Sequence, residues 1–267
     1  MKKCWLLIIA LFFSLPALAF EHTHKAWDDL LKKHVSYASD GNASTVSYSG
    51  FARDRAPLEA YIDSVAQVQK TEFDAWSKAQ QQAFLINAYN ALTVEKILTR
   101  YPDIQSIKDF GSFVGNPWKD KFFTLFGKPA SLDQIEHEIL RAEGVYNEPR
   151  VHVAVVCASI GCPMLRNTAF TAEKLDLQLE DAMRRFLSDR SRNRYNAETN
   201  SLEVSRIFDW YKKDFEKGNK GYTSLEATLA KYANQLADKP EDRQAVGDRK
   251  APIKYREYDW SLNDAKG

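Results

Sequence analysis

Apolar residues recur at helical spacing along much of the chain, and the most apolar of the predicted helices covers residues 77–99. Ser77 and Gln80 have the spacing of a capping box, which marks the first turn of this helix. Over residues 84–98 the apolar positions go nearly all the way round the helix axis. This pattern is typical of a helix that is buried on every side.

Two amides, Asn87 and Asn90, interrupt the apolar surface of this helix three residues apart on one face. Burying an unpaired amide costs about 1–3 kcal/mol, so both side chains need hydrogen-bond partners. We favour the interpretation that they tie the helix to neighbouring backbone. The alternative is that they orient a catalytic group or a ligand.

Helical patterns outnumber strand patterns in the rest of the chain, and no repeated βαβ unit is found. Further helices are predicted at 22–36, 57–68, 132–141, 171–189 and 208–215. A last helix is predicted from the cap at Thr223 to about Ala233. Strands are predicted at 45–48, 121–126, 151–156, 202–204 and 253–263. We therefore expect an α+β fold, a helix-rich single domain over residues 20–267 with a small, mainly antiparallel sheet and one fully buried central helix.

The predicted strand at 151–156 leads into the most reactive stretch of the sequence. It is apolar and β-branched, which suits a strand buried on both faces, and Gly161 and Pro163 mark a turn after it. Cys157 and Cys162 lie in this turn. In a regular strand His152 and Cys157, five residues apart, would point to opposite faces.

The helix predicted at 132–141 carries a second group of candidates. Glu136 falls inside its apolar face and His137 lies on the margin. A carboxylate that faces a core is unusual unless it is paired, so we expect an ion pair with Arg141, Arg150 or Arg166. Without a cation, burial would instead favour the protonated carboxyl, which suits a general acid.

The first nineteen residues have the features of a signal peptide. Lys2 and Lys3 precede an apolar run that is too short to span a bilayer, and Ala17 and Ala19 fit a cleavage site. We expect residues 1–19 to be removed and the protein to be periplasmic or secreted, without an integral membrane span. Cleavage changes the formal net charge from +1 to about −1, which argues against a nucleic-acid partner.

Export leaves several chemistries open for Cys157 and Cys162, because disulfides persist outside the cytoplasm. A structural disulfide between them is favoured. The alternatives are a thiol nucleophile, a redox-active pair and a metal site. No strong metal-ligand spacing is present, and we predict no metal and no cofactor.

Five separated segments resemble one family in the expected order. They are residues 83–92, 131–141, 152–166, 207–211 and 258–263. The resemblance is to the domain-of-unknown-function 547 family and covers about residues 73–263. Members stand beside glutaredoxin-like domains in animals, which hints at thiol chemistry. A more distant analogy is with papain-like and transglutaminase-like cores, although the buried helix has Ala83, Asn87 and Asn90 where those cores place a cysteine.

Two functional hypotheses follow. The first is a thiol-dependent hydrolase or acyltransferase that acts on an amide or ester, with Cys157 as nucleophile and His137 as base. Glu136, Asn87 and Asn90 are the supporting polar groups in this hypothesis. The second is a non-catalytic module that binds a small molecule, peptide, glycan or protein partner, with the two cysteines as a structural disulfide. Candidate binding residues are His152, Cys162, Arg166 and Trp260.

Overall fold

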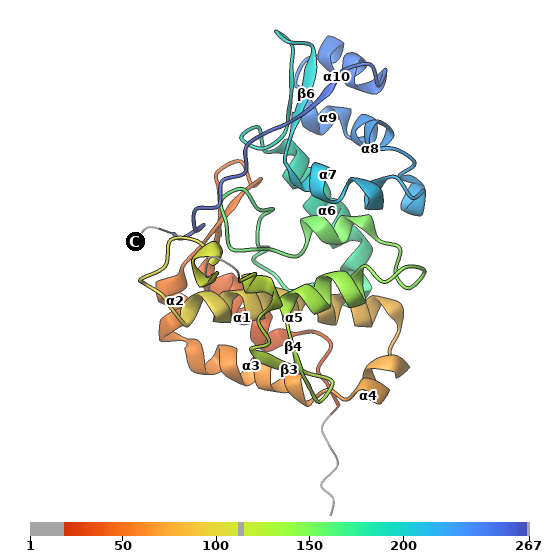
Figure 1. The fold of residues 1–267 in the computed structure, drawn as a ribbon. Coiled ribbons are helices and arrows are strands. Elements are labelled where there is room, and N and C mark those ends of the chain that lie inside the picture. Colours follow the sequence, from red (N-terminus) through yellow and green to blue (C-terminus); the bar gives the residue numbers. More distant parts are fainter. Residues whose placement is uncertain (1–18, 112–114, 266–267) are drawn as a thin grey trace, which may run out of the picture.

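The computed structural model describes residues 19–111 and 115–265 (Figure 1). Residues 1–18 of the predicted signal peptide lie outside the described residues. The protein is a helix-rich α+β structure, as the sequence predicts, and its described residues form three small sheets in place of one. None of the helices in the described part of the chain is long and apolar enough to cross a membrane.

The helices fall into an N-terminal group and a C-terminal group. The first group is α1 Lys25–His34, α2 Tyr48–Arg53, α3 Arg55–Gln67, α4 Lys70–Ala75 and α5 Lys78–Leu98. The second group is α6 Leu175–Ser188, α7 Ile207–Trp210, α8 Leu225–Lys231, α9 Ala233–Leu236 and α10 Pro240–Gly247. A π-helix, Gln134–Leu140, and a 3₁₀ turn, Pro149–Val153, lie between the two groups in sequence.

Helix α5 is the centre of the N-terminal group, and its capping box forms as predicted. The Ser77 side chain accepts from the Gln80 amide, and the Gln80 side chain accepts from the Ser77 amide. Every residue from 81 to 98 except Glu95 is buried. Helix α5 is therefore the central helix against which the surrounding segments pack.

Three small sheets complete the fold. The hairpins pair β1 Val35–Tyr37 with β2 Ser44–Val46, and β3 Phe123–Leu125 with β4 Lys128–Ala130, both antiparallel. The third sheet has the order β5 Arg194–Asn196, β6 Ser201–Val204, β7 Ile253–Tyr255. Its β6–β7 pair is parallel, because β7 returns to the sheet after the helices α8 to α10.

Two apolar cores are joined by α6 and by the end of the chain. Leu179 of α6 packs in the N-terminal core, whereas Met183, one turn later, packs in the C-terminal core. After β7 the C-terminal segment, residues 256–265, runs from the three-stranded sheet back to the N-terminal helices (dark blue in Figure 1). It is fixed there by backbone hydrogen bonds between Val46 and residues Asn263 and Ala265.

The prediction of a strand at residues 151–156 is wrong. Residues 149–153 form a 3₁₀ turn, and the chain then continues without a regular partner to Cys157. Burial itself was predicted correctly, since Val151, Val153 and Val155 are all buried. A short apolar run shows only that a segment is enclosed, because a buried turn and a buried strand can have the same composition.

Other boundaries also differ from the predictions. Helix α3 begins two residues before Pro57, and the helix predicted at 132–141 is mostly a π-helix. The predicted aromatic helix at 208–215 is divided into α7 and a 3₁₀ turn, Lys212–Phe215.

Candidate functional site

A cavity of about 320 Å³ lies between the two groups of helices. Its walls come from α5, the π-helix, the chain around Cys157, α7 and the C-terminal segment. Its polar lining includes Asp133, Glu136, His137, His152, Cys157 and Cys162. Its aromatic lining consists of Tyr89, Trp118, Trp210, Tyr211, Tyr258 and Trp260.

The backbone on either side of Cys157 is held tightly. The Asn90 side chain donates to the Ala154 carbonyl oxygen at 2.9 Å and accepts from the Val156 amide at 3.0 Å. Directly after the cysteine, Ala158 has a φ of 61°, in the left-handed region that residues with a Cβ rarely adopt. Such a conformation persists only where the surroundings impose it, and it makes the chain turn sharply at Cys157.

A close backbone approach continues this turn. The Gly161 amide donates to the Asp259 carbonyl oxygen at 2.8 Å. A Cβ at Gly161 would meet the Asp259 amide nitrogen at 2.9 Å, which is closer than side-chain carbons come to backbone. Glycine at this position therefore lets the cysteine loop lie directly against the C-terminal segment.

The Cys157 sulfur has three polar neighbours. Its Sγ lies 3.2 Å from the Cys162 Sγ, and 3.1 Å from both the Ser159 and the Tyr258 hydroxyl oxygens. The hydrogen bond with Cys162 is the largest influence that lowers the Cys157 pKa to about 7, outweighing the opposite effect of burial. Burial, together with the Cys157 charge, raises the pKa of Cys162 well above its usual value.

The predicted structural disulfide is wrong for this structure. A disulfide has a sulfur–sulfur distance of about 2.05 Å, whereas these two sulfurs are 3.2 Å apart and both thiols are free. The Cys157 amide also donates to the Cys162 sulfur, at 3.0 Å. The Cys162 sulfur thus accepts hydrogen bonds from both the thiol and the amide of Cys157.

His152 is a fully buried imidazole held by a carboxylate. Its Nε2 lies 2.9 Å from the Asp214 Oδ2, and its ring stacks on Tyr211 with centroids 3.7 Å apart. Burial lowers the His152 pKa, outweighing the opposite effect of the Asp214 hydrogen bond. In the neutral ring Nε2 carries the proton that Asp214 accepts, so Nδ1 carries the lone pair. Nδ1 has no hydrogen-bond partner among the described residues.

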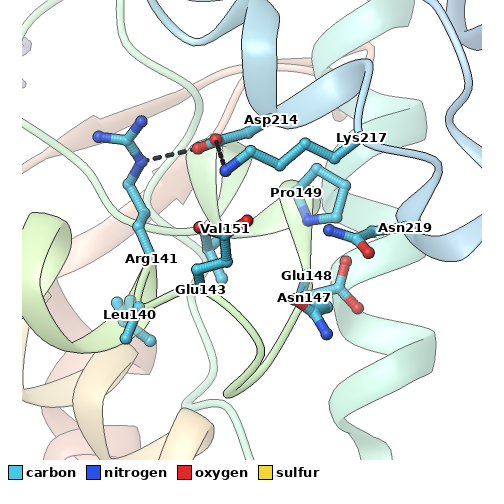
Figure 2. Close-up of a pocket in the computed structure, with 11 residues that line it drawn as sticks. Leu140, Arg141, Glu143, Asn147, Glu148, Pro149, Val151, Asp214, Lys217 and Asn219 are labelled. Carbon is cyan, nitrogen blue, oxygen red and sulfur yellow. Dashed lines mark hydrogen bonds and ion pairs between the residues drawn. The ribbon is translucent and has the colours of Figure 1, made fainter.

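Asp214 is fixed from two further sides, as Figure 2 shows. Arg141 Nε lies 2.7 Å from its Oδ2, and Lys217 Nζ lies 3.3 Å from its Oδ1. Burial acts to raise the Asp214 pKa, but the hydrogen bonds from His152 and Arg141 bring it well below its usual range. The hollow drawn in Figure 2 has a volume of about 30 Å³, about a tenth of the volume of the cavity beside Cys157.

Glu136 lies in the cavity wall without a cation, so the predicted ion pair is wrong. The Tyr211 hydroxyl donates to its Oε1 at 2.5 Å, and the Tyr89 hydroxyl to its Oε2 at 3.0 Å. Burial, and then the Glu136 charge, raise the pKa of both tyrosines, which keeps them as donors. The three arginines predicted as partners, Arg141, Arg150 and Arg166, pair with other carboxylates.

His137 also lines the cavity, but it is more exposed than His152. The Arg141 guanidinium forms a hydrogen bond with its Nδ1, and its Nε2 lies 3.9 Å from an Asp133 oxygen. A guanidinium can only donate, so the lone pair of Nδ1 is occupied. Between the two histidines, His152 has the arrangement expected of an oriented base.

The family described as "Protein of unknown function, DUF547" matches residues 73–187. This chain carries a DUF547 domain. No curated protein and no solved structure matches the chain.

The DUF547 match contains only part of the cavity. It includes Glu136, His152 and Cys157, whereas the aromatic residues around α7 and in the C-terminal segment follow residue 187. Asp214, which pairs with His152 outside the cavity lining, also follows it. Residues outside the matched range therefore complete the cavity of the DUF547 domain.

The structure separates the predicted site residues into two sets. Trp260 and Cys162 line the cavity, as do the four residues discussed above, Glu136, His137, His152 and Cys157. Asn87 does not line it, because its amide donates to the Phe170 carbonyl oxygen and accepts from the Phe170 amide. Asn90 and Arg166 are likewise used in structural contacts. The favoured interpretation of both asparagines, as ties from the helix to backbone, is confirmed.

Sequence reasoning missed Asp214, Tyr89, Tyr211 and Tyr258 as site residues. Tyr211 and Tyr258 stand within segments of the family resemblance, so that signal was present. Asp214 stands in a charged stretch with no local motif. Among residues 19–111 and 115–265, no group of three or more histidine, cysteine, aspartate or glutamate residues is suited to hold a metal ion.

Proposed function

We propose that this cavity is the active site of a thiol-dependent hydrolase or acyltransferase that acts on an amide or ester, with Cys157 as its nucleophile. The observation that carries the proposal is the environment of the Cys157 sulfur. It lines the cavity, has three polar neighbours within 3.2 Å, and has its pKa lowered to about 7. Since the thiolate is the reactive form, such a cysteine is substantially activated at neutral pH.

The remaining residues of the cavity fit the other roles in acyl transfer. The thiolate attacks the acyl carbon, a sulfur–carbon bond forms, and the carbonyl electron pair moves to oxygen. The Ser159 and Tyr258 hydroxyls, both near the sulfur, are the candidate donors to that oxygen. As the tetrahedral adduct collapses, the carbonyl forms again, the leaving amine or alcohol takes a proton from water and departs, and an acyl-thioester remains on Cys157.

His152 is the proposed general base for the second half of the reaction. Its Nδ1 would take a proton from water or from an acceptor nucleophile, which attacks the thioester and releases Cys157. Asp214 orients the ring and stabilises the imidazolium that forms. Because His152 is buried and its pKa is lowered, the ring is neutral and ready to accept a proton at pH 7.

A test of this function uses p-nitrophenyl acetate and the purified chain. We expect release of p-nitrophenol, with an acetyl group trapped on Cys157 in the mass spectrum. Cys157→Ala should abolish both signals. His152→Asn should slow deacylation, whereas His137→Asn, at the exposed histidine of the same cavity, should have a smaller effect. Turnover that survives Cys157→Ala would refute the proposal.

The alternative is a non-catalytic module that binds a peptide, glycan or protein partner. One observation favours it: Trp210 is 46% exposed beside the cavity and stacks against Trp260, with centroids 5.7 Å apart. Exposed aromatic faces are common in ligand recognition. In this case Cys157→Ser would keep full binding while Trp210→Ala would lose it, and no ester turnover would be seen in either.

Export is the last part of the proposal. The leader-like residues 1–19 support a periplasmic or secreted protein. A fusion of residues 1–30 to alkaline phosphatase, which is active only after export, tests this directly. Activity that persists when Leu6, Leu7 and Ile8 are all changed to Asp would contradict it.

A further inference from the structure

The charge of the cavity lining is one-sided. Asp133 and Glu136 contribute carboxylates, and neither lysine nor arginine stands among the described residues that line the cavity. Burial lowers the pKa of His152, so this ring adds no positive charge at neutral pH. Arg141, which contacts His137 and the Tyr211 ring behind the lining, is paired with Asp214.

Glu136 is the carboxylate that most needs a cation, because it is only 6% exposed and water can solvate little of its charge. No ion pair to it occurs within the described residues, and its two hydrogen bonds come from neutral tyrosine hydroxyls. Buried carboxylates in proteins are normally paired with a cation. A cation that enters the cavity would supply this pairing for Glu136.

The aromatic wall offers what such a cation would need. Tyr258 and Trp260 lie with ring centroids 4.6 Å apart and tilted by 51°, and Trp210 packs on both. Rings set at angles present several π faces to one space, and a cation within about 6 Å of such a face is attracted. The Lys108 ammonium already lies 4.6 Å from the Trp260 ring centroid, so this wall does accept an ammonium group.

We infer that the cavity binds a cationic group, an alkylammonium or guanidinium, between the Asp133 and Glu136 carboxylates and the aromatic wall. The inference rests on the proposed function only in taking this group to be part of an acyl substrate or acyl acceptor. Neutral sugars also use aromatic walls, but they would leave Glu136 without a cation.

Charge-selective labelling of Cys157 tests the inference without a known substrate. The thiolate attacks the sulfenyl sulfur of a methanethiosulfonate, a mixed disulfide forms, and methanesulfinate leaves. The cationic reagent carries a trimethylammonium-ethyl group and the anionic one a sulfonatoethyl group. Peptide mapping by mass spectrometry assigns the label to Cys157, and a short unfolded peptide that contains the same cysteine gives the reference rate ratio.

We expect the cation-to-anion rate ratio at Cys157 to exceed the peptide's ratio by on the order of tenfold. Glu136→Gln should reduce the ratio towards that of the peptide, and so should Asp133→Asn, which perturbs the fold less because its side chain is 22% exposed. Glu173→Gln, a surface carboxylate absent from the cavity lining, is the matched control and should leave the ratio unchanged. A wild-type ratio equal to that of the peptide would overturn the inference.

A protection assay identifies the ligand class. Choline should slow alkylation of Cys157 by neutral iodoacetamide, whereas its neutral isostere 3,3-dimethylbutan-1-ol should not. Equal protection by the isostere, or by glucose, would overturn the inference in favour of a neutral ligand. Labelling needs only an accessible thiol, so charge selectivity without ester turnover would refute the proposed function and keep the cation site. Ester turnover without charge selectivity in labelling would keep the proposed function and refute the cation site.

Discussion

Replacement of Asn90 by alanine tests how the buried helix positions the nucleophile. The Asn90 side chain forms two hydrogen bonds, to the Ala154 carbonyl and the Val156 amide, and is 2% exposed. Each buried backbone group left without a partner costs about 1–3 kcal/mol. Because water can relieve part of this loss, we expect Asn90→Ala to reduce the free energy of unfolding by about 2–4 kcal/mol.

Asn87 provides a matched control on the same helix. It also forms two buried hydrogen bonds to backbone, both to Phe170, which lies outside the cavity lining. Asn87→Ala should therefore lose a similar amount of stability. Only Asn90→Ala should raise the pKa of Cys157, because only that change loosens the chain that places the sulfur beside Cys162.

Two measurements on each variant separate these effects. Urea denaturation gives the free energy of unfolding, and the pH dependence of iodoacetamide alkylation gives the pKa of Cys157. Equal alkylation midpoints in the two variants would refute the idea that Asn90 positions Cys157. Stability unchanged in both would refute the assignment of the amides as ties between helix and backbone.

Three further changes give distinct expected results. Cys162→Ala removes the largest influence lowering the Cys157 pKa, so the alkylation midpoint should move upward from about 7 towards the ordinary value of 9.0. Asp214→Asn should slow ester turnover by about tenfold or more through misorientation of His152, yet leave the alkylation midpoint unchanged. Tyr48→Phe removes a 2.8 Å hydrogen bond to the C-terminal segment and should cost about 1 kcal/mol of stability in urea denaturation.

Much of the fold was predictable because local chemistry determines it. The capping box at Ser77 and the continuous apolar surface that follows it specify α5 and its burial. The long α6 has a clear amphipathic signal. The hairpins were predicted only in part: β2 and β3 overlap predicted strands, whereas β1 begins inside the helix predicted at 22–36, and β4 was not predicted. The strand prediction at 151–156 failed because this segment is apolar as a result of its burial between α5 and α6. A buried segment need not be a strand.

The site was only partly predictable, for a related reason. Cys157, Glu136 and His152 stood out as reactive residue types in apolar surroundings, which a sequence displays directly. Their partners did not, since Asp214 is 62 residues along the chain from His152, and Tyr258 is 101 residues from Cys157. His152 and Cys157 were expected to face apart because a regular strand was predicted between them. That expectation does not apply, because residues 149–153 form a 3₁₀ turn.

The pH dependence of Cys157 alkylation in the unmodified protein tests the central claim most directly. The rate constant for iodoacetamide at Cys157, followed by peptide mapping between pH 5 and 10, should rise with a midpoint near pH 7, because the thiolate forms as the pH passes the pKa of about 7. A midpoint near 9, or a cysteine that does not react at any pH, would contradict an activated nucleophile in this cavity.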